Sequence, residues 1–469
     1  MRWVHLLAVL AIVSAGSAQA SDLRAGAAAV VINPPTGTPM AGYYSARGST
    51  AILDNLYCKS LVLEQDSVRI ALVVCDLISL PRRSITEARR LIEKEAGIPG
   101  SHVMISATHT HTGPVVARES SRDDLDGGSS DLGRRYTEAL PALIAQSVSE
   151  ALKKVAPAHL QAARTKEDHL SFNRRFFMRD QTVSWNPRKL HPDIVKPAGP
   201  IDPEVAFLQF ATPQSKPIAT YVNFAMHPDT TGGDAISADY PGVLARLLTE
   251  CQGPDVITVF ANGCCGNLNH RNIGWADVQK GPHEARRIGT VLAGDVCDAF
   301  PLLQPLKTGG LQVKSTIVAL PLAPVRAAEI VQAKDVLKRM RDPKTPFLEK
   351  VKAFQVLDVA ARDGKPWEVE VQVISWGNQV AWVSLPGEIF VELGLAIKKA
   401  SPFPYTFIAE LANGSIGYIP DQPAYAQGNY EVVSARCAEG SGEMLVEAAV
   451  RALKDLYHGV QPSPSSKER

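Results

Sequence analysis

Apolar runs that end in polar turns recur along the chain and predict an α/β protein. Residues 68–75 and 103–107 are almost continuously apolar, as strands buried on both faces are. Between them lies a helical spacing of apolar positions, with a capping-box sequence at residues 84–87 and Gly97 where a helix would end. Ligands in α/β proteins bind beyond the carboxyl ends of parallel strands, so this order places a candidate site just after residue 107.

The same alternation continues to the end of the chain. It predicts helices at residues 137–155, 240–251 and 442–457, and strands at 205–210, 219–224, 256–260, 368–375 and 379–385. Gly377 and Asn378 form a two-residue hairpin turn in this prediction. Residues 324–363 predict two exposed helices that act as a cover or an insertion. We therefore expect a mixed, largely parallel sheet core with flanking helices, and no internal repeat at a fixed period is apparent.

The ends of the chain differ from its middle. Residues 1–20 have the charge, apolar stretch and small-residue cleavage site of a secretory signal peptide, and residues 461–469 predict a disordered tail. One domain is expected over residues 21–460. No later segment reaches the roughly 18 apolar residues that a membrane-spanning helix needs. An exported protein, periplasmic or secreted, is the resulting expectation.

The net charge and the cysteine spacing restrict the classes of binding partner and metal site. A net charge of +1 among 469 residues gives no electrostatic basis for binding nucleic acid, although peripheral contact with a membrane is still compatible with it. The seven cysteines contain no CxxC pair, which argues against a cysteine zinc site. The oligomeric state is left open.

The segment Thr108-His109-Thr110-His111-Thr112 carries the most specific chemistry. Histidines two residues apart lie on the same side of an extended segment, so both can reach one site. Imidazole is the commonest metal ligand, which suggests a metal hydrolase with its site at the strand C-terminal ends. The alternative is a histidine pair that merely ends a strand.

Three later segments resemble site loops. His227 follows an apolar run, a glycine-rich turn follows Phe260, and Glu388 follows a predicted hairpin at the start of a predicted helix, 388–398. The glycine turn lets backbone N–H groups approach a ligand but lacks the spacing of a phosphate loop. Glu388 at a first helical turn could simply complement the helix dipole.

Together these motifs resemble the neutral (non-lysosomal) ceramidase family, in its catalytic domain. The resemblance runs from about residue 24 to 456 and rests on ordered motifs: Ser-Ala-Thr-His-Thr-His-Thr-Gly-Pro, Asn-Phe-Ala-Met-His-Pro, the turn after Phe260, Leu-Pro-Gly-Glu and two late tyrosines. Family members usually continue into a C-terminal immunoglobulin-like domain, which we expect to be absent here.

The resemblance implies a zinc site and its surroundings. It places the Zn²⁺ ligands at His109, His227, Glu388 and Tyr418, and Tyr418 precedes Tyr430 by the family's twelve residues. It also implies that His111 and Tyr430 polarise the carbonyl or stabilise the oxyanion, and that Arg174 contacts substrate. A weaker assignment, from the residues themselves, makes Asp239 an orienting partner of a ligand.

The sequence departs from the family in the glycine turn, where the family's aspartate and serine are Asn267 and Asn269. Asparagine cannot be acylated, so we expect attack by zinc-bound hydroxide, with Asn269 positioning substrate or stabilising charge. Three functions stay open. They are a ceramidase-like amidohydrolase acting on a small-molecule or lipid amide, a zinc esterase or amidase for a smaller substrate, and a non-catalytic binding relative.

Overall fold

The computed structural model describes residues 22–459, apart from residues 45, 119, 121 and 308. The predicted signal peptide and the predicted tail therefore lie outside the described residues. Within the described range, no helix combines the length and apolar character needed to cross a membrane.

Three large sheets share one strand order and one set of strand directions. The first contains β1 (Arg24–Val31), β3 (Tyr57–Gln65), β4 (Val68–Cys75) and β5 (Val103–Ala107). The second contains β7 (His159–Lys166), β12 (Glu204–Ala211), β13 (Pro217–Phe224) and β15 (Ile257–Asn262). The third contains β18 (Leu311–Leu320), β19 (Trp367–Trp376), β20 (Val380–Ser384) and β22 (Tyr405–Ala409). In each sheet the first three strands are antiparallel and the fourth is parallel to the third.

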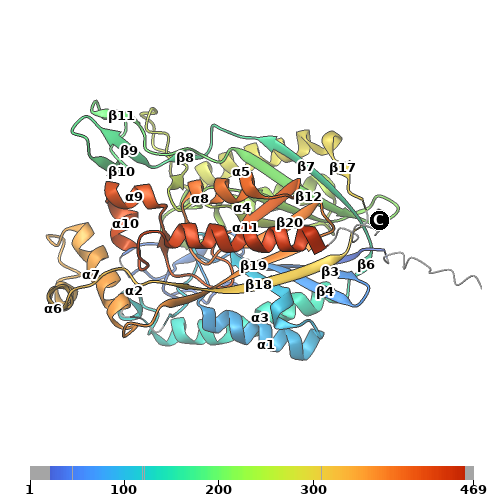
Figure 1. The fold of residues 1–469 in the computed structure, drawn as a ribbon, viewed down its shortest axis with the longest axis horizontal. Coiled ribbons are helices and arrows are strands. Elements are labelled where there is room, and N and C mark those ends of the chain that lie inside the picture. Colours follow the sequence, from blue (N-terminus) through green and yellow to red (C-terminus); the bar gives the residue numbers. More distant parts are fainter. Residues whose placement is uncertain (1–21, 45, 119, 121, 308, 460–469) are drawn as a thin grey trace, which may run out of the picture.

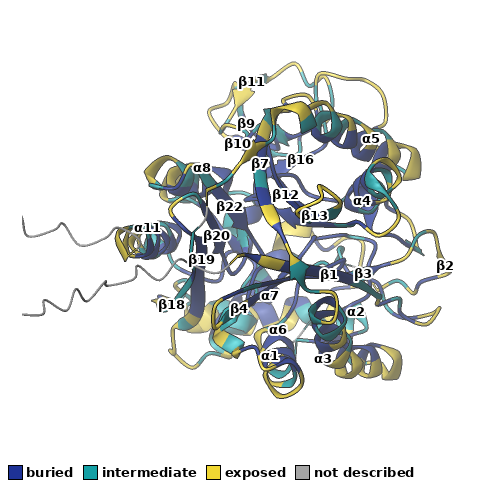
Figure 2. Ribbon diagram, turned by 90° about the vertical axis from the view of Figure 1, so that its right-hand side faces the viewer, coloured by how far each residue is buried: buried dark blue, intermediate teal, exposed yellow. Residues whose placement is uncertain are grey.

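Each parallel pair is joined by a helix, and a second helix follows the last strand. The joining helices are α1 (Arg82–Ala96), α4 (Asp239–Gln252) and α8 (Val391–Ala400), and the following helices are α3 (Asp131–Leu152), α5 (Pro282–Asp298) and α11 (Ser441–Gly459). Figure 2 shows these helix pairs on the outside of the molecule, with the buried strands between them. The chain thus repeats one β-β-β-α-β-α unit three times, a repeat that has no fixed sequence period and was not predicted.

The prediction of a largely parallel core is wrong, although the mixed α/β class and flanking helices are confirmed. Among the described long strands, each sheet has one parallel pair and two antiparallel pairs. Antiparallel strands are often apolar on one face only. Here both faces are buried, because helices cover the outer face and the other two sheets cover the inner face. A continuous apolar run therefore does not distinguish a parallel strand from an antiparallel one in this protein.

One central core joins the three sheets. It includes Leu72 from the first sheet, Tyr221 from the second, and Trp382 and Phe407 from the third, all almost fully buried. The Tyr221 ring meets the Phe407 ring edge-on, with their centroids 5.6 Å apart. The inner faces of the sheets thus pack against one another.

Local predictions for the first joining helix had mixed outcomes. Strands β4 and β5 have the predicted bounds, and Gly97 ends α1 in the left-handed conformation with φ 66°. The capping box is wrong, because α1 already begins at Arg82 with Pro81 as its N-cap. The turn after β19 also differs, since Trp376 pairs with Val380 and leaves three residues in the hairpin loop.

The helices α6 (Ala327–Lys338) and α7 (Phe347–Ala360) lie at one end of the molecule, on the left in Figure 1, with α10 (Tyr430–Ser434) nearby. They occupy the stretch predicted as two helices, and α7 contributes Val351 to a buried cluster with Tyr418 and Tyr430. The remaining elements are short: β2 (Ala51–Ile52), η1 (Gly100–His102), α2 (Asp123–Asp126), β6 (Ala156–Pro157), β8 (Phe172–Asn173), β9 (Arg175–Met178), β10 (Val183–Trp185), β11 (Ile194–Pro197), β14 (Ala235–Ile236), β16 (Leu268–Asn269), η2 (Phe300–Leu302), β17 (Gln304–Pro305), β21 (Glu388–Ile389), β23 (Tyr418–Ile419) and α9 (Gln422–Gln427).

Candidate metal centre

The three sheets each deliver one predicted ligand to the same place. His109 follows β5, His227 follows β13 and Glu388 follows β20, and in each sheet the strand belongs to the parallel pair. The predicted helix at Glu388 is wrong, because Glu388 lies in β21. There it is directly opposite Tyr418 in a parallel ladder. The helix-dipole explanation for Glu388 therefore does not apply, since α8 begins only at Val391.

The two histidines of the Thr-His-Thr-His segment converge for a different reason than predicted. Strand β5 ends at Ala107, and His109 adopts the left-handed conformation with φ 76°, so the segment is not an extended strand. A non-glycine residue seldom has this conformation, and the surrounding structure must hold it there. His109 Nδ1 lies 2.7 Å from the carbonyl of Ile78, which fixes the ring.

Backbone carbonyls also fix the other two imidazoles. Nδ1 of His111 lies 3.1 Å from the Gly42 carbonyl, and Nδ1 of His227 lies 2.8 Å from the Cys265 carbonyl. Because a carbonyl can only accept, we assign a proton to Nδ1 of each ring, which leaves Nε2 directed into the cluster. Burial lowers the pKa of His111 to about 4, and burial followed by repulsion from Arg174 lowers the pKa of His227 well below its usual value. Both rings are therefore neutral near pH 7.

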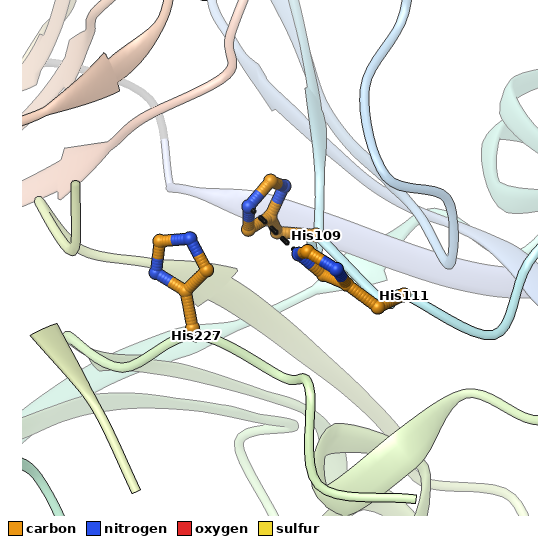
Figure 3. Close-up of side chains that lie close together, drawn as sticks. All are labelled: His109, His111 and His227. Carbon is orange, nitrogen blue, oxygen red and sulfur yellow. Dashed lines mark hydrogen bonds between the residues drawn. The ribbon is translucent and has the colours of Figure 1, made fainter. Parts of the chain in front are cut away.

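These nitrogens face one another and a carboxylate. His109 Nε2 lies 3.4 Å from His111 Nε2, and Glu388 Oε2 lies 3.4 Å from His109 Nε2 and 3.3 Å from His227 Nε2. Figure 3 shows the three rings turned toward a common point. Oε2 of Glu388 is buried and, among the described residues, has no hydrogen-bond donor.

This donor set fits a metal ion. Buried lone pairs gathered around one point repel one another unless a cation lies between them. Two or three imidazoles and one carboxylate are a recognised ligand set of catalytic zinc. The geometry does not separate His111 from His109 and His227, since all three belong to one cluster.

Arg174 and Tyr418 adjoin the cluster. The Arg174 guanidinium donates to Glu431 at 2.9 Å, to the Gly266 carbonyl at 2.6 Å and to the Tyr418 hydroxyl at 3.1 Å, and one nitrogen lies 3.3 Å from His227 Nε2. Arg174 thus connects the Tyr418 hydroxyl to the glycine-rich turn through hydrogen bonds. Both side chains are almost fully buried.

Tyr430 and Asn269 lie on the walls of a cavity of about 540 Å³ beside the cluster, here called the outer cavity. The ring of Tyr430 lies 4.4 Å from the ring of Trp185 and 5.4 Å from that of Phe347, centroid to centroid. Asn269 donates to Asn186 at 2.8 Å and accepts from the backbone of Arg271 at 3.0 Å. All the predicted site residues thus gather at one end of the three sheets.

One predicted role in the site is wrong, and one residue beside the site was not predicted. Asp239 accepts hydrogen bonds from Thr230 and Thr231, and within the described residues it has no hydrogen bond to a predicted ligand, so its assignment as an orienting partner is wrong. Glu410 was missed. It follows β22 and accepts from the backbone N–H groups of Cys265 and Ile389, and burial raises its pKa to about 8. The strand-end rule that selected His109 would have found Glu410 as well.

Two solved structures share this fold. The neutral ceramidase from Pseudomonas aeruginosa superposes with a TM-score of 0.75 at 18% identity, over 96% of this chain and 76% of that chain. A ceramidase complexed with C2 superposes with a TM-score of 0.73 at 19% identity, over 95% of this chain and 77% of that chain. No family model matches the chain, and no curated protein matches its sequence. The expected resemblance is confirmed for the fold.

Proposed function

We propose that this chain is a zinc-dependent hydrolase that cleaves an N-acyl (amide) bond. The observation that carries the proposal is the convergence of imidazole Nε2 atoms on the unpartnered Oε2 of Glu388. The ceramidase fold supports it, because the structures that share this fold are described as ceramidases.

In this proposal His109, His227, Glu388 and Tyr418 hold the metal. A zinc ion bound there would act as a Lewis acid and generate a hydroxide nucleophile from water near neutral pH. Tyr418 is opposite Glu388 in the β21/β23 ladder, and the Arg174 guanidinium holds its hydroxyl. Arg174 thus orients a ligand as well as lining the outer cavity.

His111, Tyr430 and Asn269 act on the substrate. Neutral His111 can accept a proton at Nε2, and the Tyr430 hydroxyl can donate a hydrogen bond to the oxygen that becomes negative as the carbonyl is attacked. Asn269 has a second amide N–H available for the substrate beyond the one given to Asn186. The nucleophile is water, because an asparagine carries no group that can be acylated.

The test combines metal content with activity. Purified protein should contain about one equivalent of zinc and should cleave short N-acyl amides or ceramide in a chelator-sensitive reaction. His109→Ala should lose both zinc and activity. Asn269→Ala should keep zinc and lose activity by about 100- to 1000-fold, as expected for an oxyanion donor.

His159→Ala is the matched control, because His159 is an exposed histidine on β7 and belongs to neither group of possible metal ligands among the described residues. It should keep full zinc content and full activity. Protein that contains no zinc and does not acquire it would contradict the proposal and favour a non-catalytic binding relative.

A further inference from the structure

A second, smaller cavity adjoins the candidate metal centre. It encloses about 80 Å³, and its walls include His109, His111 and Glu388, together with Arg118, Arg122 and Arg436. We call it the arginine cup. His111, Tyr418 and Tyr430 line both this cup and the outer cavity. A substrate whose carbonyl lies at the metal centre can therefore extend into both spaces.

The three guanidinium groups differ in their partners. Arg436 is almost fully buried and is neutralised by Asp358, at 2.8 Å from Nε and 2.6 Å from a terminal nitrogen. Arg118 donates to the Ser79 hydroxyl, and Arg122 lies over the rings of Tyr44, at 4.6 Å, and Phe354, at 5.2 Å. Among the described residues, neither Arg118 nor Arg122 forms a side-chain ion pair within 4.0 Å.

Arg436 is paired with Asp358, and Glu388 is assigned to the metal in the proposed function. Two arginines and one carboxylate, Asp126, therefore remain in the cup, which is an excess of one positive charge. Asp126 also lines it, but that carboxylate is not within ion-pair distance of an arginine in the described chain. Burial, followed by repulsion from Arg122 and Arg436, lowers the pKa of Arg118 below its usual value. Half-buried guanidinium groups that have no carboxylate partner among the described residues are costly, and an anion in the cup would offset that cost.

The size of the cup restricts what enters it. A single water molecule needs about 10–15 Å³ on this measure of volume, so the cup admits a short polar group and not a long alkyl chain. The outer cavity, with Trp185, Phe347 and Tyr430 on its walls, is the larger and more aromatic space.

We propose that the substrate carries an anionic oxygen group, a carboxylate or a phosphate, which binds in the arginine cup while its other end occupies the outer cavity. This inference rests on the proposed function and specifies its substrate class. The chain then acts on N-acyl compounds with an acidic head group in preference to a neutral sphingoid amide. Arg118 and Arg122 are the residues that determine this specificity.

The test uses three ligands of similar length: N-butanoylglycine, N-butanoyl-O-phosphoethanolamine and neutral N-butanoylethanolamine. Their affinities for the zinc-loaded protein are measured by calorimetry, and their cleavage is followed in parallel. At least one anionic ligand should bind about tenfold or more tightly than the neutral one, as charge-assisted hydrogen bonds allow. Preference for N-butanoylglycine would identify a carboxylate, and preference for the phosphate ester would identify a phosphate.

Variants locate the effect in the cup. Arg122→Met should remove most of the anionic preference, about tenfold, with a much smaller change in affinity for the neutral ligand, and Arg122→Lys should restore part of the preference. Arg90→Met is the control, because Arg90 is an exposed arginine on α1 that pairs with Glu87. It should leave every affinity unchanged. Thermal unfolding of each variant confirms that it is folded.

Equal affinity for neutral and anionic ligands, or no binding of either anion, would overturn the arginine-cup proposal. The two proposals fail in different ways. Efficient cleavage of neutral amides with no anionic preference would support the hydrolase proposal and contradict the arginine-cup proposal. Tight anion binding that depends on Arg122, in a protein that binds no zinc, would support anion binding in the cup and contradict the hydrolase proposal.

Discussion

Three buried carboxylate oxygens have no hydrogen-bond donor among the described residues, and two of them, on Glu388 and Asp295, lie in opposite settings. Oε2 of Glu388 faces imidazole nitrogens, so a cation would satisfy it. Oδ2 of Asp295, on α5, is also unpartnered, but its nearest charged neighbours are the carboxylates of Glu167 and Asp298. The first arrangement indicates a site, and the second indicates a local cost to stability.

That cost gives a prediction for pH dependence. Burial, then repulsion from Glu167 and Asp298, raises the pKa of Asp295 to about 6 in the folded protein, above its usual value near 4. The folded state therefore binds the proton more tightly, so its contribution to stability is complete below about pH 4 and is lost as the pH rises through 6. Asp295→Asn should be more stable than the native chain at pH 7.5, by about 1 kcal/mol after allowance for solvent screening at this partly exposed position.

Urea unfolding at pH 4 and pH 7.5 measures this difference. At pH 4 the variant and the native chain should have the same free energy of unfolding, since Asp295 is then protonated. A variant that is equally stabilised at both values would show that the carboxylate charge is not the cause.

At the scale of the element, two glycines with open surroundings should respond oppositely to alanine. Gly97 ends α1 at φ 66°, and a Cβ there would meet no atom within 4 Å, so the cost of Gly97→Ala is backbone strain alone. A loss of about 1 kcal/mol is expected. Gly294 lies inside α5, also with nothing within 4 Å, so Gly294→Ala should gain about 0.5–1 kcal/mol. Denaturant unfolding of both variants checks the two signs.

The elements also show what the sequence could predict. Strands β4 and β5 and the end of α1 followed from apolar runs and a glycine, because these signals act within a few residues. The convergence of His109 and His111 was predicted for the wrong reason, since the left-handed φ of His109 depends on distant contacts. Strand direction was mispredicted, because burial on both faces here comes from the layering of three sheets.

The same limit applies to the site. His109, His227 and Glu388 each had a local signal, namely a polar residue just after an apolar run. The arginine cup had none, because Arg118, Arg122 and Arg436 come from loops and short helices that meet only in the folded chain. A group of residues that only tertiary contacts bring together cannot be predicted from their spacing along the sequence.

At the scale of the whole molecule, the three sheets depend on one another. Their inner faces form one core, and polar contacts add to it, since Arg89 of α1 lies 2.8 Å from Glu370 of β19. The candidate metal centre takes one predicted ligand from the segment after a strand of each sheet, so a shift of any sheet would separate these residues. A shared core therefore makes the site a property of all three units together.

Cooperative unfolding follows from this shared core. Trp382 of the third sheet is fully buried, and its ring centroid lies 6.3 Å from that of Tyr221 in the second sheet. Trp382→Ala leaves a large cavity between the sheets, so we expect a loss of about 3–5 kcal/mol. Because the core is common, the calorimetric transition should move to lower temperature as one peak.

Trp382→Phe serves as the graded comparison. It keeps most of the ring packing and removes an indole N–H that has no acceptor among the described residues, so its loss should be less than half that of alanine. Zinc content should fall in step with the folded fraction in both variants. If the third unit instead melted in a separate, earlier transition while the first two kept their heat of unfolding, the sheets would be independent folding units and the metal centre would be assembled from preformed parts.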